Sequence, residues 1–374
     1  MARDIVQRAE AVGHARSVVR ADPAADVAGY LARLGVPRPE RPDAAWLSLA
    51  HRAHMARVPY ENLEIQLERT TSVDPVEAIA RIVRGRGGYC FHLNGAFGLL
   101  LACLGYQVTR HLADVRGQDV DEAAAQDAAD AAGATGVVGL ASAGGVVGER
   151  GAAESAKAAD GAVAAGLRTG LGAGDDTGFG AGRDVSHQAL KVRCAEGEEW
   201  FVDCGLGDAP YEPMPLRVGE SVQGPFTYRL EPWAERPGGW RFVHDPKAGS
   251  FSSMVFAPEP VDVEAFAAAH RRLSTSPDSG FVRSAVVGRR DAFAKEVLRG
   301  RVFTRIDAAG RSERTIETRG EWFALLADVF GLHLREVDGA ARERLWARVS
   351  AEHEKWLAGS RPAWQDASHD ATRF

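Results

Sequence analysis

Cys90 is the residue whose surroundings point most directly to chemistry. It follows the glycine pair Gly87 and Gly88 after one tyrosine, and it opens an apolar run with helical spacing. The amino end of a helix favours the thiolate, which is the nucleophilic form of cysteine, so this position predicts a reactive thiol. His187 and Asp203 add an imidazole and a carboxylate beside strand and turn residues. Together the three residues predict a Cys-His-Asp arrangement for acyl transfer.

His187 and Asp203 are expected to meet across a β-hairpin. Residues 195–197, Ala-Glu-Gly, suit a three-residue loop with glycine in the left-handed position. Such a loop places Ala189 opposite Asp203, so that His187 lies diagonal to the carboxylate on the same face. The carboxylate can then orient the imidazole, whose other nitrogen faces Cys90. A two-residue loop would turn the two side chains to opposite faces and break the arrangement.

The elements that must position these residues change in type along the chain. Residues 24–105 have mostly helical patterns, and the helix that follows Cys90 is expected to end at Gly105. Alternating and β-branched residues begin at Tyr106, and strand patterns resume at Val185. The last third is expected to mix both types, with a helix over 264–272, strands over 281–287 and 302–306, and helix again from 320.

Bulk composition excludes several classes of protein. The 374 residues are 45% hydrophobic and 26% charged, which is typical of a globular protein with two or three core-forming units. A net charge of -6 gives no electrostatic footprint for nucleic acid or for an anionic membrane surface. Residues 1–20 lack the apolar run of a secretory signal. The 4 cysteines include no C-x-x-C pair, so we expect a cytoplasmic protein with reduced thiols and no metal.

The segment 117–184 differs in character from the rest of the chain. It consists largely of Ala, Gly and Asp, and its one aromatic residue is Phe179. Because so little apolar bulk cannot offset the entropy of ordering, we predict a flexible insertion. A tolerated surface insertion is the favoured interpretation, and an active-site lid is the alternative.

Several stretches resemble the arylamine N-acetyltransferases. The run RGGYCFHLN at 86–94 resembles the nucleophile motif of that family, and VPYENL at 58–63 resembles its other N-terminal signature. The segments SHQ at 186–188 and VDCGLG at 202–207 match its histidine and aspartate segments in the expected order, and STSPDS at 274–279 is similar to the opening of its C-terminal domain. One departure is His92, which stands where many members of the family have Glu.

The resemblance implies an α+β fold. An N-terminal helical bundle would carry the nucleophile, a central β-barrel would carry His and Asp, and a C-terminal α/β lid would follow. We place the helical domain at 1–105, the barrel domain at 106–258 with the insertion at 117–184, the lid at 259–350 and a polar tail at 351–374.

The resemblance also implies a ping-pong acyltransferase that acts in xenobiotic metabolism. Acetyl-CoA, as co-substrate, would acylate Cys90, and an arylamine, hydrazine or arylhydroxylamine would then take the acetyl group. By position, Tyr60, Phe91 and Leu206 match residues that line the family's acceptor pocket, although ordinary core packing explains such residues equally well. The predicted partner is therefore a small aromatic amine or hydrazine, and no oligomeric state is predicted.

Other functions compete with this interpretation. An amide synthase that forms macrolactams from a carrier-protein-bound acyl chain would use the same architecture. A cysteine protease would use the same triad, but the resemblance extends beyond the triad. A non-catalytic relative that binds a CoA-like or aromatic ligand, or a structural scaffold, would have no need of all three of Cys90, His187 and Asp203.

Overall fold

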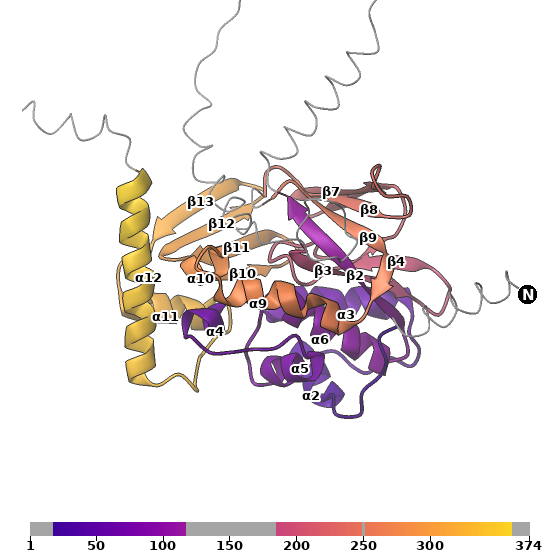
Figure 1. Cartoon of the computed structure of the whole chain (residues 1–374), viewed down its shortest axis with the longest axis horizontal. Coiled ribbons are helices and arrows are strands. Elements are labelled where there is room, and N and C mark those ends of the chain that lie inside the picture. Colours follow the sequence, from indigo (N-terminus) through magenta and orange to yellow (C-terminus); the bar gives the residue numbers. More distant parts are fainter. Residues whose placement is uncertain (1–17, 117–184, 249–250, 361–374) are drawn as a thin grey trace, which may run out of the picture.

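The computed structural model describes residues 18–116, 185–248 and 251–360, and Figure 1 shows the arrangement of their elements. Helices from the first part of the chain lie beneath a curved sheet, and a second sheet with further helices lies beside it. The predicted insertion at 117–184 and residues 361–374 of the predicted tail fall outside the described residues.

The amino-terminal helices begin where aspartates cap them. The side chains of Asp26, Asp43 and Asp74 each accept a hydrogen bond from a backbone N–H of the first turn, which satisfies donors that a helix leaves free. The central helix is buried on all sides, because neighbouring helices cover one face and the sheet covers the other. The helices are α2 (Val27–Leu34), α3 (Ala44–Arg57), α4 (Leu63–Gln66), α5 (Pro75–Val83) and the central α6 (Cys90–Cys103).

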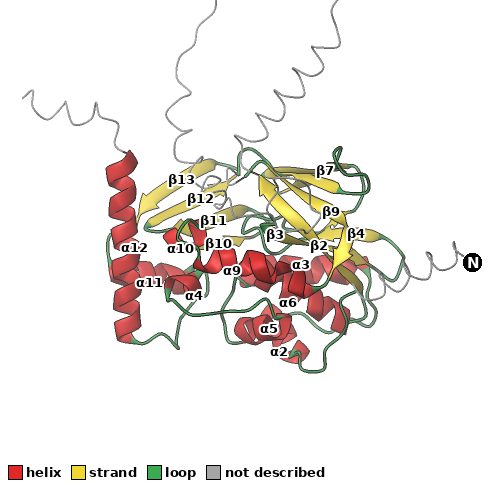
Figure 2. Ribbon diagram, in the orientation of Figure 1, coloured by secondary structure: helices red, strands yellow, loops and turns green. Residues whose placement is uncertain are grey.

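The larger sheet has eight antiparallel strands and curls into a nearly closed barrel (Figure 2). Aromatic side chains such as Phe201, Phe242 and Phe256 fill its interior and are almost completely buried. In spatial order, its strands are β5 (Met214–Pro215), β4 (Glu199–Val202), β3 (His187–Arg193), β2 (Gln107–Arg116), β9 (Ser253–Val261), β8 (Trp240–Val243), β7 (Phe226–Pro232) and β6 (Gly219–Gln223).

The smaller sheet has five strands, and the first of them comes from the amino-terminal part of the chain. Its strands are β1 (Tyr60–Glu61), β10 (Val286–Arg290), β11 (Ala294–Arg299), β12 (Val302–Asp307) and β13 (Gly310–Thr315). Around them lie η1 (Val263–Phe266), α9 (Ala267–Thr275), α10 (Gly280–Arg283), α11 (Arg319–Asp328) and α12 (Gly339–Ser360). Leu63 of α4 packs into the core of this unit with Trp322 and Leu326.

Two local predictions were wrong. Residues 281–283 are helical rather than extended, because the Ser279 side chain accepts a hydrogen bond from the Phe281 N–H and caps α10; the strand begins only at Val286. The predicted tail begins too early, since α12 continues to Ser360, with His353 buried against the unit. The prediction of an α+β fold with a helical bundle, a barrel and a C-terminal α/β unit is confirmed for the described residues.

Candidate active site

Cys90 is the first residue of α6, as the sequence predicts. Tyr89 is the N-cap residue, and its side chain makes no capping hydrogen bond to the described helix. The partial positive charge of the first turn therefore remains available to a thiolate. Cys90 is only 3% exposed, and its Sγ atom donates to the Ser186 carbonyl over 3.7 Å. The helix and the start of β3 thus meet at the thiol.

Two glycines let other segments approach the backbone on either side of Cys90 closely. A Cβ atom at Gly87 would lie 1.9 Å from the carbonyl oxygen of Pro59, and one at Gly205 would lie 2.7 Å from the Cα atom of Cys90. Real Cβ atoms do not make contacts this short, so a side chain at either position would displace backbone. The glycines of the two motifs therefore serve the approach of backbone to backbone around Cys90.

The hairpin that carries the imidazole has the predicted register. β3 and β4 pair Leu190 with Val202, and the Cys194 N–H donates to the Glu198 carbonyl over 3.0 Å. Gly197 closes the three-residue loop with a φ of 90°. This register confirms the predicted loop and brings His187, at the start of β3, to the same side as Asp203.

His187 bridges the cysteine and the carboxylate. Its Nε2 atom lies 2.7 Å from Oδ2 of Asp203, and its ring also interacts with the Cys90 side chain closely enough to affect its pKa. Because Nε2 faces Asp203, Nδ1 is left for the thiol. Burial disfavours the charged ring, but the charge and hydrogen bond of Asp203, with a smaller effect of Cys90, raise the pKa of His187 to about 10. The geometry therefore favours a protonated imidazole beside the sulfur.

Asp203 is itself held from two directions. Its Oδ1 atom accepts from the Gly205 N–H over 2.8 Å, and its carbonyl oxygen lies 3.1 Å from Nε2 of His51. The other ring nitrogen of His51 lies 3.0 Å from the Tyr211 carbonyl. His51, which is buried on α3, thereby ties the loop that follows β4 to the helical bundle.

Asn94 and His51 are site residues that sequence reasoning missed. Asn94 lies one turn after Cys90 on α6; its Nδ2 atom donates to the Gln188 carbonyl over 2.5 Å, and its Oδ1 accepts from the Cys204 N–H over 2.7 Å. It therefore joins both β3 and the loop that follows β4 to the helix. The signal was an amide four residues after the cysteine in an apolar run. No local pattern could have revealed His51, because its contact with Asp203 spans 152 residues of sequence.

A buried ion pair joins the two amino-terminal motifs. Glu61 and Arg86 are almost fully buried, and the arginine Nη2 atom lies 3.0 Å from the carboxylate Oε1. The Glu61 N–H also donates to the Gly88 carbonyl over 2.8 Å. Arg86 pairs in addition with Glu64 and with Glu336 of the C-terminal unit. These contacts hold the loop that precedes Cys90 against β1.

The three predicted pocket residues have different environments. Phe91 is completely buried in an aromatic cluster beside Phe266. Tyr60 and Leu206 are half-buried, and the Tyr60 ring packs near Phe281 with 6.4 Å between the centroids. Tyr60 and Leu206 could thus meet a ligand, whereas Phe91 serves first as packing for the helix start.

The departure at His92 has a clear structural context. The His92 ring packs edge-on against Tyr89, with 4.6 Å between the centroids, and it also contacts His270. Burial lowers the pKa of His92 well below its ordinary value, and the nearby charges of Arg81 and His270 lower it further. The ring is therefore neutral at pH 7, so this position brings neither a positive nor a negative charge to Cys90.

Two further features bear on the kind of protein. Among the described residues, no group of three or more His, Cys, Asp or Glu side chains is placed to hold a metal ion. The helices of the described ranges include none that is both long and apolar enough to cross a membrane.

Comparison with known proteins identifies the family. A family model described as N-acetyltransferase matches residues 44–129 and 175–338, which is more than half of the chain. The chain belongs to the arylamine N-acetyltransferase family. Residues 130–174, which the family model leaves unmatched, fall within the predicted insertion.

Individual members of the family show how far the likeness extends. An arylamine N-acetyltransferase of Mycolicibacterium smegmatis is 38% identical over 27% of this chain and 37% of its own length. Proansamycin X synthase of Amycolatopsis mediterranei is 34% identical over 22% of this chain and 34% of its own length. The chain thus spans about a third of the length of these curated relatives. The arylamine N-acetyltransferase of Mycobacterium marinum in complex with CoA shares the fold, with 20% identity, a TM-score of 0.64, and coverage of 87% of this chain and 98% of that one.

Proposed function

We propose that this chain transfers an acetyl group from acetyl-CoA to an arylamine, hydrazine or arylhydroxylamine through an acyl-cysteine at Cys90. The observation that carries the proposal is the arrangement at the amino end of α6, where His187 lies 2.7 Å from Asp203 and interacts electrostatically with Cys90. Membership of the family supports acetyl transfer, and the relative solved with CoA supports the donor.

In the first half-reaction, Cys90 acts as the nucleophile. His187 holds a proton that the Cys90 sulfur has given up, and the thiolate attacks the carbonyl carbon of acetyl-CoA. A carbon–sulfur bond to Cys90 forms, the bond to the CoA sulfur breaks, and the proton on His187 passes to the leaving thiolate. Backbone N–H groups at the helix start, with that of Cys90 as the first candidate, would stabilise the oxyanion.

In the second half-reaction, the acceptor takes the acetyl group. An aromatic amine is neutral at pH 7, so its nitrogen attacks the thioester without prior deprotonation. The proton that the amine loses passes to neutral His187, and the bond to the Cys90 sulfur breaks as the amide forms. The imidazolium and thiolate pair is thereby restored. Asp203 stabilises the charged ring in the resting enzyme and keeps Nδ1 directed at the sulfur.

The acceptor is proposed to lie against Tyr60 and Leu206. Both side chains are half-buried beside the nucleophile loop, and Gly207 packs directly on the Tyr60 ring. Phe91, which is fully buried, would support the site by packing and would not contact the acceptor. This arrangement presents aromatic and aliphatic surface, which suits a flat aromatic amine.

A second candidate is an amide synthase. The similarity to proansamycin X synthase favours it. Its 34% identity to this chain is close to the 38% identity of the Mycolicibacterium smegmatis arylamine N-acetyltransferase. Such an enzyme would accept an acyl chain from a carrier protein and would react slowly with acetyl-CoA.

Intact-mass measurement after incubation with acetyl-CoA tests the proposal. We expect one acetyl adduct on the wild-type protein, none on Cys90→Ala, and an unchanged adduct on the matched variant Cys103→Ala. Repeating the incubation with propionyl- and malonyl-CoA, and then adding anilines and hydrazides, defines the donor and the acceptor. An adduct on Cys103, Cys194 or Cys204 would overturn the assignment of the nucleophile. Slow acetylation together with rapid acylation by a carrier-bound chain would favour the amide synthase.

A further inference from the structure

An arginine occupies a position of β2 that faces the helices packed outside the barrel. Val108, Arg110 and Leu112 alternate along β2 and share one face, and Val108 and Leu112 belong to two separate apolar clusters. The residue paired with Arg110 on β3 is the fully buried Leu190. Arg110 is itself only 7% exposed. The chain therefore has a cation where the strand pattern would place an apolar side chain.

Nothing in the described protein neutralises this cation at contact distance. The buried Nε atom of Arg110 has no hydrogen-bond partner among the described residues. Burial lowers the pKa of Arg110 to about 10, while Asp262 and Glu264 oppose that shift only through space. A buried charge without a partner destabilises the fold, so a ligand that supplied the missing partner would relieve that cost.

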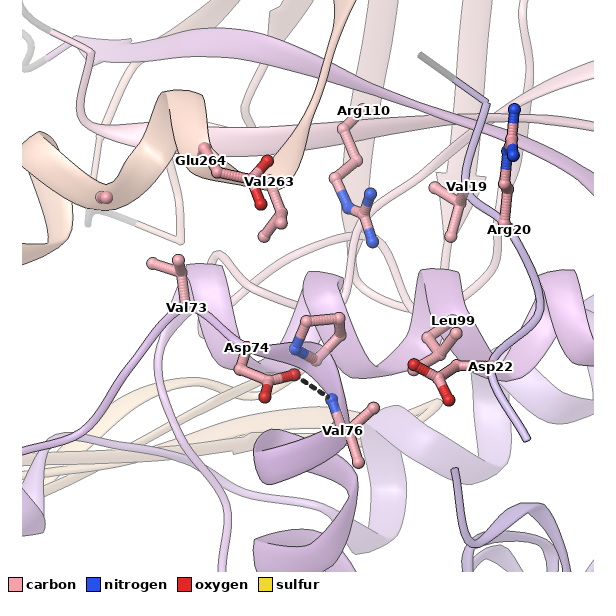
Figure 3. A pocket seen from close by; sticks show the side chains of 12 residues that line it. Val19, Arg20, Asp22, Val73, Asp74, Val76, Leu99, Arg110, Val263 and Glu264 are labelled. Carbon is pink, nitrogen blue, oxygen red and sulfur yellow. Dashed lines mark hydrogen bonds between the residues drawn. The ribbon is translucent and has the colours of Figure 1, made fainter. Parts of the chain in front are cut away.

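The Arg110 side chain points into a pocket of about 390 Å³ (Figure 3). Val19, Val76, Leu99 and Val263 give the pocket apolar walls. None of the residues that line it belongs to the Cys90 site. Its volume lies within the range of small-molecule sites, at the low end of roughly 300–1,000 Å³.

Three carboxylates on the wall exclude a simple anion as the ligand. Asp22, Asp74 and Glu264 line the pocket together with Arg110 and Arg20, so the lining is net negative. Asp22 and Asp74 each use one carboxylate oxygen to accept a backbone N–H, from Ala24 and Val76 respectively. In the described structure, the second carboxylate oxygen of Asp22 and that of Asp74 can therefore face a cationic group.

We propose that this pocket binds an aliphatic α-amino acid as a zwitterion, at a site separate from the acyl-transfer centre. The ligand carboxylate accepts hydrogen bonds from the Arg110 guanidinium, which matches carboxylate geometry. The ligand ammonium faces the acidic side chains, of which Glu264 is exposed at the mouth. The aliphatic side chain lies on the valine and leucine walls.

Calorimetric titration of the full chain with L-leucine tests this proposal. N-acetyl-L-leucine lacks the cation and L-leucinamide lacks the anion, so each analogue should bind at least about tenfold more weakly than L-leucine. No measurable binding of L-leucine up to about 10 mM would overturn the proposal. Equal binding of either analogue would overturn it too, because recognition would then not require both charges.

Matched variants assign the binding to the named residues. Arg110→Met should abolish binding of L-leucine, whereas Arg84→Met, which removes the same charge from an exposed side chain that does not line the pocket, should change it less than about twofold. Should Arg110→Met fail to fold, Glu264→Gln at the surface provides the second test, and it should weaken L-leucine but not N-acetyl-L-leucine. Equal losses from the two arginine variants, or no effect of Glu264→Gln, would contradict the proposal.

Discussion

Gly205 lies directly against the backbone of Cys90. A Cβ atom built at Gly205 falls 2.7 Å from the Cα atom of Cys90 and 3.0 Å from its carbonyl oxygen. The same glycine donates its N–H to Oδ1 of Asp203. One residue thus fixes the separation between the helix that carries the thiol and the loop that carries the carboxylate.

Gly205→Ala should therefore impair the reaction and the fold together. The methyl group must move either α6 or the loop, and overpacking of this kind costs roughly 1–3 kcal/mol of unfolding free energy. We expect the rate of Cys90 acetylation to fall by at least about tenfold, because small misplacement of reacting groups is costly. Gly320→Ala is the control, since Gly320 lies in the first turn of α11 with open space around its Cα atom. Urea unfolding and intact mass measure the two effects, and wild-type behaviour of Gly205→Ala would refute the close contact.

Asp203→Asn should change the pH dependence of stability. The folded-state pKa of His187, about 10, lies above the ordinary value of about 6.5. The imidazolium therefore adds stability that is fully present below about pH 6.5 and is lost as the pH rises through about 10. Asp203→Asn removes most of that contribution, so its deficit in unfolding free energy should be largest at about pH 6.5 and just below, and should shrink towards pH 10. A deficit that stays constant across this range would show that His187 is not the titrating group.

Arg86→Met should destabilise the fold strongly. It leaves Glu61 buried without its nearest charged partner, and breaking a buried pair costs roughly 3–5 kcal/mol. Arg84→Met, two residues earlier and exposed, should cost less than about 0.5 kcal/mol. Chemical unfolding of both variants measures the difference. If the double variant Arg86→Met, Glu61→Leu regains much of the loss, the carboxylate left without Arg86 is the cause. No recovery would point to packing, or to the loss of the Glu61–Arg81 ion pair, instead.

Deletion of residues 118–182 should leave a folded protein. β2 and β3 pair Ala113 with His187, and the Ser186 N–H donates to the Ala113 carbonyl over 3.1 Å, so the strand ends on either side of the deletion already lie opposite each other. A short glycine-rich turn can join them. Cooperative unfolding and retained acetylation of Cys90 are the expected results. A loss of cooperativity would show that the insertion contributes to the core.

Prediction from sequence succeeded where the cause was local. The loop at 195–197 determined the hairpin register, and the glycines before Cys90 marked a helix start. Prediction failed at residues 281–283, where a serine cap outweighs β-branched and aromatic residues that favour a strand. The hydrogen bonds of Asn94 and His51 escaped notice because they join segments whose proximity only the folded chain creates.

The two-residue strand β1 limits how this protein can be divided. Tyr60 pairs with Gly88, in the loop that precedes Cys90, and also with Gly288 of the C-terminal sheet. A fragment that ends before Val286 would lack β10. Tyr60 and Glu61 would then lose their partner in the C-terminal sheet and keep only their contact with the loop before Cys90. The loop that carries Cys90 and the carboxyl-terminal half thus share one strand, and neither portion can be expected to fold as a free-standing module.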